Sequence, residues 1–250
     1  MPKSASFDVL GTCFHFEPVI DVINSIIKRN PDINTPIDAT TLFHSWFYAA
    51  QRDFTYTSTA GSYQPIAGIF RHTFRRACAI VDFPDVEKNI SDTDIEMLMT
   101  ELQRLPARDG LKECFDGLKD AGFDVYAVTN GGKEASLKYY RLADIELDAD
   151  HLLSCDDIKA AKPDPKVYAN ANEWLQSRGC EATADVDGKQ VGQRWFVAAH
   201  SWDLLAARKA GFRTAWVAHE EHDPVTQVFG DFDVYAKDLK ECFEKIKAAS

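Results

Sequence analysis

Short apolar runs alternate with helical segments along the second half of this chain, and this alternation limits the fold more than any other feature. Strands that alternate with helices of such length form parallel βαβ units. The sequence therefore predicts an α/β protein with a doubly wound, parallel, Rossmann-like sheet. The expected strands are 123–128, 151–153, 195–198, 214–217 and 233–235, and the expected helices are 109–121, with Asp109 as its cap, 133–141, 165–177, 203–210 and 238–248.

Another apolar run, at the start of the chain, predicts a buried strand that ends on a carboxylate. Residues 5–9 read Ala-Ser-Phe-Asp-Val, and Gly11 and Thr12 follow. A charged Asp8 at the end of a buried strand is unfavourable unless it is paired, hydrogen-bonded or used. An ordinary turn or helix-cap aspartate is the alternative. In an open α/β sheet, this end of the strand is where ligands bind.

Residues 16–104 separate the first strand from the others and show helical periodicity without convincing strands. We expect them to form an all-helical cap inserted after the first strand, with residues 1–15 and 105–250 forming the Rossmann-like core. The stretch 178–193 is expected to be a surface loop, because it is rich in Gly, Asp and Thr.

Composition excludes several classes of function. The formal net charge of −11 argues against a nucleic-acid groove or an anionic membrane surface, since both need basic residues. The six cysteines show no spacing suited to zinc. No apolar stretch has the length of a membrane span or signal peptide. We expect a cytoplasmic protein with reduced thiols, without a metal or cofactor.

Polar residues follow four of the expected strands. Because the carboxyl ends of parallel strands meet at one edge of a sheet, these side chains should converge there. Each also has a simpler interpretation as a helix cap or as packing. The four groups are Asp8 with Thr12, Thr129 with Asn130, Lys162 with Tyr168, and His200 with Trp202 and Asp203.

The order of these motifs resembles the haloacid dehalogenase superfamily, and within it the type II 2-haloacid dehalogenases. The resemblance spans nearly the whole chain. Its segments are Phe-Asp-Val-Leu-Gly-Thr at 7–12, Lys-Pro-Asp-Pro at 162–165 with Tyr168, and Ala-Ala-His-Ser-Trp-Asp-Leu at 198–204. It implies a hydrolase that removes halide from a small 2-haloalkanoic acid through an aspartyl ester. It also implies a homodimer, because dimers are common in that family.

The resemblance implies a role for each residue at the strand ends. Asp8 is the expected nucleophile, and Lys162 is expected to keep its carboxylate ionised and oriented. Asp203 is expected to position or activate the hydrolytic water, with His200 assisting it or contacting the halide. Donors to the nucleophile or to the substrate carboxylate are expected from Thr12, Thr129 and Asn130.

Two positions separate this chain from the phosphatases of the same superfamily. Those enzymes carry a second aspartate two residues after the nucleophile, where this chain has Leu10. They also carry an acidic residue for Mg²⁺ four positions before the late aspartate, where this chain has Ala199. A hard cation needs oxygen ligands, so a metal site is disfavoured. A phosphatase, and a repurposed binding or accessory protein, are the alternative functions.

The helical insertion departs from the resembled enzymes, which place an arginine early in the cap to receive halide and substrate. Here that stretch reads Phe-His-Ser-Trp-Phe-Tyr at 43–48. His44 or Arg52 is expected to replace the arginine, with Trp46 and Tyr48 in an aromatic wall, although aromatic residues at helical spacing more often form a core. The full set of expected substrate-binding residues is Leu10, His44, Trp46, Arg52, Tyr168 and Trp202.

Overall fold

Six parallel strands form one sheet, in the order β3-β2-β1-β6-β7-β8. The structure is a computed structural model that describes residues 2–30, 37–182, 184–186 and 189–250. The parallel pairing confirms the predicted α/β class and sheet. The strands are β1 Lys3–Phe7, β2 Phe123–Thr129, β3 Leu152–Ser154, β6 Arg194–Ala198, β7 Arg213–Val217 and β8 Val234–Ala236.

The central strand β1 delivers Asp8 to the carboxyl edge of the sheet. It lies between β2 and β6, and its last four residues are buried. The backbone N–H of Asp8 still donates to the carbonyl of Val197 at 2.9 Å, so pairing with β6 fixes the backbone up to the carboxylate.

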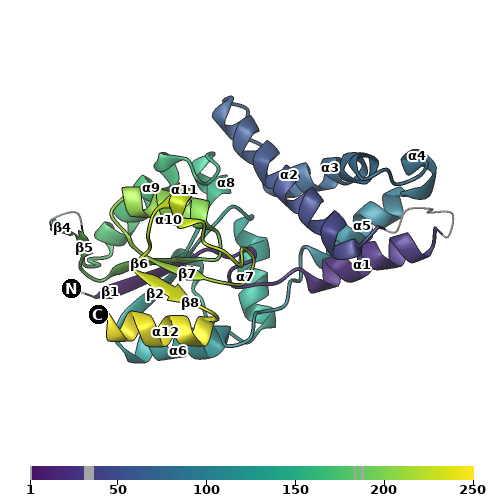
Figure 1. Cartoon of the computed structure of the whole chain (residues 1–250). Coiled ribbons are helices and arrows are strands. Elements are labelled where there is room, and N and C mark those ends of the chain that lie inside the picture. The colour runs from purple at the N-terminus through teal and green to yellow at the C-terminus, as the bar shows by residue number, and fades with distance from the viewer. Residues whose placement is uncertain (1, 31–36, 183, 187–188) are drawn as a thin grey trace. The chain divides into compact units, whose positions relative to one another are not determined.

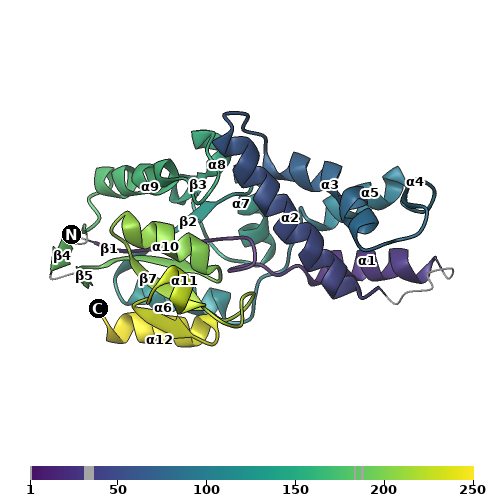
Figure 2. The same cartoon turned by 45° about the horizontal axis from the view of Figure 1, so that its top comes forward.

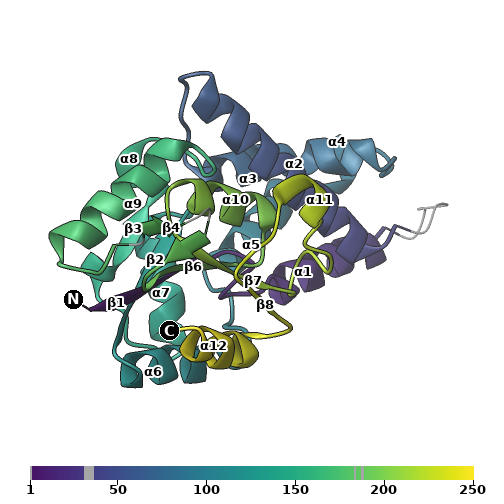
Figure 3. The same cartoon turned by 60° about the vertical axis from the view of Figure 1, so that its left-hand side comes forward.

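Helices cover both faces of this sheet. Figure 1 and Figure 3 show α6 and α12 side by side on one face, and Figure 1 shows α9 and α10 on the other. This two-sided cover explains why most residues of these strands are buried. The helices of this part are α6 Leu111–Asp120, α7 Lys133–Leu142, α8 Cys155–Ile158, α9 Pro165–Ser177, α10 Ser201–Lys209, α11 Thr226–Phe229 and α12 Leu239–Ala248, with a short 3₁₀ turn at Ala149–His151.

Two local predictions were wrong. Gly110, and not Asp109, is the residue that caps α6. Its φ is 79°, a left-handed conformation that glycine adopts more easily than aspartate. The stretch expected to be a loop contains an antiparallel pair, β4 Ala184–Val186 and β5 Lys189–Val191. Residues 183, 187 and 188 of that stretch lie outside the described residues.

The chain divides into two compact units, which we call the sheet unit (Met1–His15 with Pro106–Ser250) and the helical unit (Phe16–Leu105). Two chain segments, one before and one after the helical unit, link the two units. They hydrogen-bond to each other within the sheet unit. The N–H of His15 donates to Pro106 O at 3.1 Å, and the N–H of Arg108 donates to Cys13 O at 2.9 Å. This pairing brings Arg108 to the loop that follows Asp8.

In the described residues of the helical unit, five helices pack around aromatic side chains. Figure 2 shows the long helix α2 beside α3. None of the helices in the described parts of the chain is both long and apolar enough to cross a membrane. The helices are α1 Glu17–Lys28, α2 Ala39–Thr59, α3 Ile66–Ile80, α4 Val86–Asn89 and α5 Asp92–Glu101.

Trp46 lies at the centre of this helical core. Its side chain is 1% exposed and its ring centroid lies 5.2 Å from that of Phe70 and 4.9 Å from that of Phe74. Its indole N–H donates to Thr73 Oγ1 at 3.1 Å. The structure thus gives Trp46 a packing role, in contrast to the expectation that it lines a pocket, because α2 turns this face towards α3.

Replacing Trp46 with Ala tests this packing role. Removal of the buried ring should lower the free energy of unfolding by about 3–5 kcal/mol. The matched control is Tyr48→Ala on the same helix, where a side chain that is 40% exposed should contribute only about 0.5 kcal/mol. Urea denaturation measures both, and equal stability of the two variants would contradict the assignment.

Candidate active site

The carboxylate of Asp8 is buried and receives a donor on each oxygen. Lys162 Nζ donates to Oδ1 at 2.6 Å, and Thr12 Oγ1 donates to Oδ2 at 2.7 Å. Thr12 is itself held by the N–H of Ala199, which donates to its Oγ1 at 2.9 Å. The side chain of Asp8 is therefore oriented by residues from three chain segments, and it is not an aspartate that caps a turn.

Lys162 joins two carboxylates. Its Nζ also donates to Asp203 Oδ2 at 2.6 Å and to Val128 O at 3.1 Å, and its side chain is fully buried. Three acceptors match the three hydrogens of an ammonium group. Its backbone N–H donates to Asn130 Oδ1 at 3.0 Å, so Asn130 fixes the loop that carries the lysine.

Asp203 is bound from two sides. Oδ2 receives Lys162, and Oδ1 accepts a hydrogen bond from the hydroxyl of Tyr168, which projects from α9. The residue that caps α10 is His200, so Asp203 does not serve as its cap. Tyr168 and Asp203 thus belong to the same buried cluster as Asp8.

His200 lies on the other side of Asp8 from Lys162. Its Nδ1 is 3.6 Å from Asp8 Oδ2, its side chain is buried, and its ring centroid is 5.4 Å from that of Trp202. The indole of Trp202 is half-buried and lines a largely apolar hollow of about 500 Å³ together with Pro163 and Leu205.

Burial and charge act against each other on these groups. Burial by itself raises the pKa of Asp8, but the charge of Lys162 and the contact with His200 outweigh it, and the pKa lies well below its usual value. Burial by itself lowers the pKa of Lys162, but Asp203 and Asp8 raise it above its usual value. Asp8 is therefore a carboxylate and Lys162 an ammonium at neutral pH.

The pKa of Asp203 shifts in the opposite direction from that of Asp8. Its burial raises the pKa, and the negative charge of Asp8 adds to this, while Lys162 and Tyr168 lower it only in part. Of the two acids, Asp203 is the one with the greater affinity for a proton.

Thr129 and Leu10 line the neighbouring loop. Thr129 is buried and its Oγ1 accepts from the N–H of Gly131 at 2.9 Å. Leu10 lies against the same loop, since its Cδ1 is 3.7 Å from the Cβ that Gly131 would carry. The cap of α7 is Gly132, so neither Thr129 nor Asn130 serves as its cap.

The other expected substrate-binding residues belong to the helical unit. His44 contacts Thr40 O through Nδ1 at 2.9 Å, and the guanidinium of Arg52 pairs with Asp53 at 3.0 Å. Arg76 pairs with the same aspartate. The described structure gives these residues partners inside their own unit, and their part in binding stays a prediction.

Sequence patterns missed several groups near Asp8. Cys13 donates to the backbone carbonyl of Asp8, with 3.1 Å between Sγ and O. Arg108 donates through Nε to Gly11 O at 2.7 Å and pairs with Glu220, while Glu221 accepts from the N–H of Ser201 at 2.8 Å. Only the Glu-Glu pair at 220–221, a few residues after the predicted strand 214–217, offered a signal in the sequence.

Comparison with known proteins agrees with this geometry. The family model for haloacid dehalogenase-like hydrolases matches residues 2–211. The chain belongs to the haloacid dehalogenase-like hydrolases. This membership confirms the superfamily on which the sequence prediction relied.

Relatives and solved structures agree along the whole chain. (S)-2-haloacid dehalogenase 4A of Burkholderia cepacia is 25% identical over 224 residues, which cover 89% of this chain and 85% of the relative. (S)-2-haloacid dehalogenase 1 of Pseudomonas sp. strain CBS-3 is 25% identical over 214 residues, covering 85% and 82%. A solved L-2-haloacid dehalogenase superposes with a TM-score of 0.79 at 22% identity, covering 98% and 99% of the two chains.

A further solved structure has the same fold and contains a covalently bound ligand. It is the L-2-haloacid dehalogenase of Xanthobacter autotrophicus with chloropropionic acid covalently bound. Its TM-score is 0.72 at 17% identity, with all of both chains covered.

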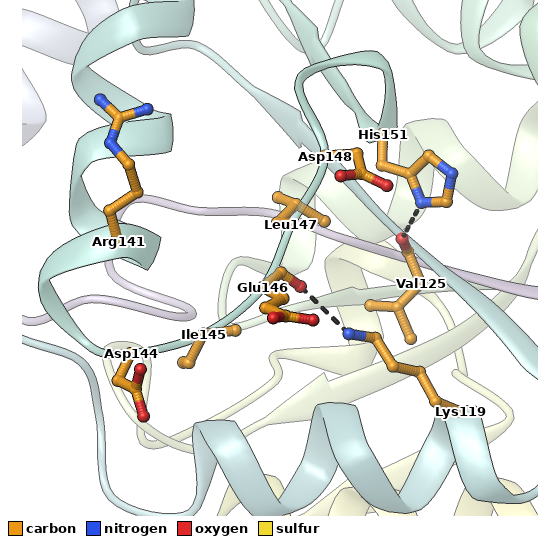
Figure 4. Close-up of a pocket in the computed structure, with 9 residues that line it drawn as sticks. All are labelled: Lys119, Val125, Arg141, Asp144, Ile145, Glu146, Leu147, Asp148 and His151. Atoms are coloured by element: carbon orange, nitrogen blue, oxygen red, sulfur yellow. Dashed lines mark hydrogen bonds between the residues drawn. The ribbon is translucent and has the colours of Figure 1, made fainter.

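A separate hollow of about 580 Å³ lies elsewhere on the sheet unit and contains none of the residues around Asp8. Figure 4 shows Lys119, whose Nζ donates to Glu146 O at 3.0 Å, and His151, whose Nδ1 contacts Val125 O at 3.0 Å. Its lining comes from α6, β2, α7 and residues 144–151, so this hollow is distinct from the candidate active site.

Replacing Lys162 with Met tests the buried ion cluster. Two buried carboxylates would then face each other without their shared cation, and the free energy of unfolding at neutral pH should fall by about 3–5 kcal/mol. In the wild type, the lowered pKa of Asp8 gives stability that is lost as the pH falls. In the variant, the pKa values of the two buried carboxyl groups should rise above their values in the unfolded chain, so protonation at low pH stabilises the folded variant. The difference in free energy of unfolding between wild type and variant should therefore become smaller towards about pH 4.

Lys166→Met is the matched control, because Lys166 lies on the exposed surface of α9. Its effect should stay within about 0.5 kcal/mol at every pH. Urea unfolding across this pH range measures both variants. A Lys162→Met protein as stable as the control would show that the cluster is not what holds this edge of the sheet.

Proposed function

We propose that this protein is a metal-independent dehalogenase that hydrolyses a small 2-haloalkanoic acid through an ester on Asp8. The observation on which this rests is the state of the Asp8 carboxylate, which is buried, ionised and oriented by Lys162 and Thr12. The relatives that share its sequence along most of its length are named as (S)-2-haloacid dehalogenases, which supports the choice of substrate.

The proposed reaction has two steps. A carboxylate oxygen of Asp8 forms a bond to the substrate carbon that bears the halogen, and the carbon–halogen bond breaks with its electron pair leaving on the halide. Water then attacks the carbonyl carbon of the Asp8 ester, the bond to the substrate oxygen breaks, and a 2-hydroxy acid leaves. The overall balance consumes one water and releases one halide and one proton.

The position of the lysine supports the proposal of metal independence. Lys162 Nζ lies 2.6 Å from Asp8 and from Asp203, so both carboxylates already have a cation that balances their charge. Leu10 and Ala199 add no oxygen ligand from their side chains. Halide, unlike an alkoxide, leaves without a proton, so no general acid is required at Leu10.

The residues around Asp8 receive their roles from this geometry. Lys162 and Thr12 keep the nucleophile in place for in-line attack. Asp203, whose pKa is raised by burial, is the proposed acceptor for a proton of the hydrolytic water. Thr129 and Asn130 shape the loop that offers N–H donors to the substrate carboxylate.

We propose that the helical unit is the cap of this enzyme. Its chain leaves the sheet unit after His15 and returns at Pro106. The first link therefore follows the loop of Asp8, and the second link hydrogen-bonds beside it. A unit attached there can admit substrate and exclude water by moving on these links. His44 and Arg52 are its proposed contributions to binding.

Asp8→Asn tests the nucleophile. Wild type is expected to release halide from chloroacetate or 2-chloropropionate, and the variant should be slower by about 10³-fold or more, because an amide is a poor nucleophile. A single turnover in water enriched in oxygen-18 should place the label on Asp8 of the wild type. Asp124→Asn on β2 is the control and should retain activity.

The result also separates the alternatives. Halide release by the wild type but not by Asp8→Asn supports the proposal. Release of phosphate from an aryl phosphate that depends on Mg²⁺ would contradict it and favour a phosphatase. If neither reaction occurs in the wild type, the protein is a binding or accessory member of the family.

A further inference from the structure

The loop after β7 contacts the nucleophile loop through charged side chains that the proposed reaction does not use. Glu220 pairs with Arg108, and their side chains are 6% and 17% exposed. Arg108 Nε donates to Gly11 O at 2.7 Å, three residues beyond Asp8. The buried pair therefore ties the β7 loop to the loop of the nucleophile.

Gly11 is packed between two of these groups. It has a φ of +85°, and a Cβ at this position would lie 3.1 Å from Glu220 Cγ and 3.1 Å from His200 Cε1. The absence of a side chain here lets Glu220 and the imidazole approach the same backbone from either side.

His200 is surrounded by negative charge. Asp8 Oδ2 lies 3.6 Å from its Nδ1, and Glu220 packs across Gly11 from its ring. Glu221 accepts from the N–H of Ser201, the residue directly after His200. Burial by itself lowers the pKa of His200, but Asp8, Glu221 and Glu220 raise it, and the net shift is upward.

The neighbouring cations are committed to other partners. Lys162 binds the opposite oxygen of Asp8, and Arg108 binds Glu220. His219, next to Glu220, has its pKa lowered to about 4 by burial and by the charge of Arg108, so it is neutral at the pH of interest. His200 is thus the group near Asp8 whose charge depends on the β7 loop.

We infer that Glu220 is a positioning residue, which helps to hold His200 as an imidazolium against Asp8 so that an anionic substrate meets a positive charge beside the nucleophile. The inference rests on the proposed function. Asp8 and Asp203 carry two negative charges at most and Lys162 one positive charge, so without the imidazolium the cluster repels a carboxylate. Glu220 adds to the field of Asp8 and Glu221 that keeps the proton on His200, and the positive charge of Arg108 partly offsets that of Glu220.

Two single variants test this inference because they should act in opposite directions. Glu220→Gln removes a negative charge, so the titration midpoint of His200 should fall by about one pH unit. Arg108→Gln removes a positive charge and leaves Glu220 unpaired, so the midpoint should rise. A role limited to packing would move both midpoints the same way or neither. NMR of the imidazole, assigned with His200→Gln, measures them in the whole protein.

The same variants should change the kinetics in a specific way. With 2-chloropropionate, Glu220→Gln should lower kcat/KM by about tenfold on the alkaline side and leave it within about twofold where His200 is protonated. Glu220→Asp keeps the charge and should restore most of the alkaline activity. Glu244→Gln, on the exposed surface of α12, is the matched control.

Each outcome bears on one claim. If the wild type releases halide but the His200 midpoint is the same in all variants, the inference is wrong and the proposed function stands. If the wild type releases no halide but the midpoints move in opposite directions, the proposed function fails and the coupling of Glu220 to His200 holds. Midpoints that move together would overturn the coupling.

Discussion

The ammonium group of Lys162, held between two buried carboxylates, is the interaction on which the rest of the site depends. Asp8 comes from the end of β1, Asp203 from the first turn of α10, and Lys162 from the loop before α9. Ion pairs in a protein interior are favourable only when their geometry is good and the remaining donors are satisfied. Here all three hydrogens of the ammonium have acceptors, because Val128 O takes the third. The cluster therefore requires the register of β2, β1 and β6 to be correct before it can form.

This requirement explains why the strand ends were predictable from the sequence while the contacts around them were not. Apolar runs and their spacing predict which residues reach the carboxyl edge, and Asp8, Lys162, Tyr168, His200 and Asp203 do meet there. The pairing of Arg108 with Glu220 joins residues 112 positions apart. No periodicity marks such a pair, since it depends on how the link after the helical unit returns beside Cys13.

The aromatic residues of the helical unit also show what a sequence pattern alone does not determine. Trp46 and Phe43 lie at a helical spacing that suits either a core or the wall of a pocket. The choice depends on which neighbour each face meets, and the face with Trp46 meets Phe70 and Phe74 of α3. Tyr48 is two residues further along and points to a different face, where it stacks on His44 with 5.9 Å between ring centroids. A pattern of hydrophobic residues cannot distinguish these faces without the partner helix.

The charge balance of the two units bears on the missing cap arginine. In the helical unit, Arg52 and Arg76 share the carboxylate of Asp53, so part of their positive charge is already neutralised. In the sheet unit, Lys162 and the proposed imidazolium of His200 offset Asp8 and Asp203 without any group from the helical unit. The chain as a whole carries −11, and that field repels an anion until it comes within about 8–10 Å of local cations. With His200 protonated as proposed, the two cations beside Asp8 offset the two carboxylates, so this charge balance needs no arginine from the 43–48 stretch.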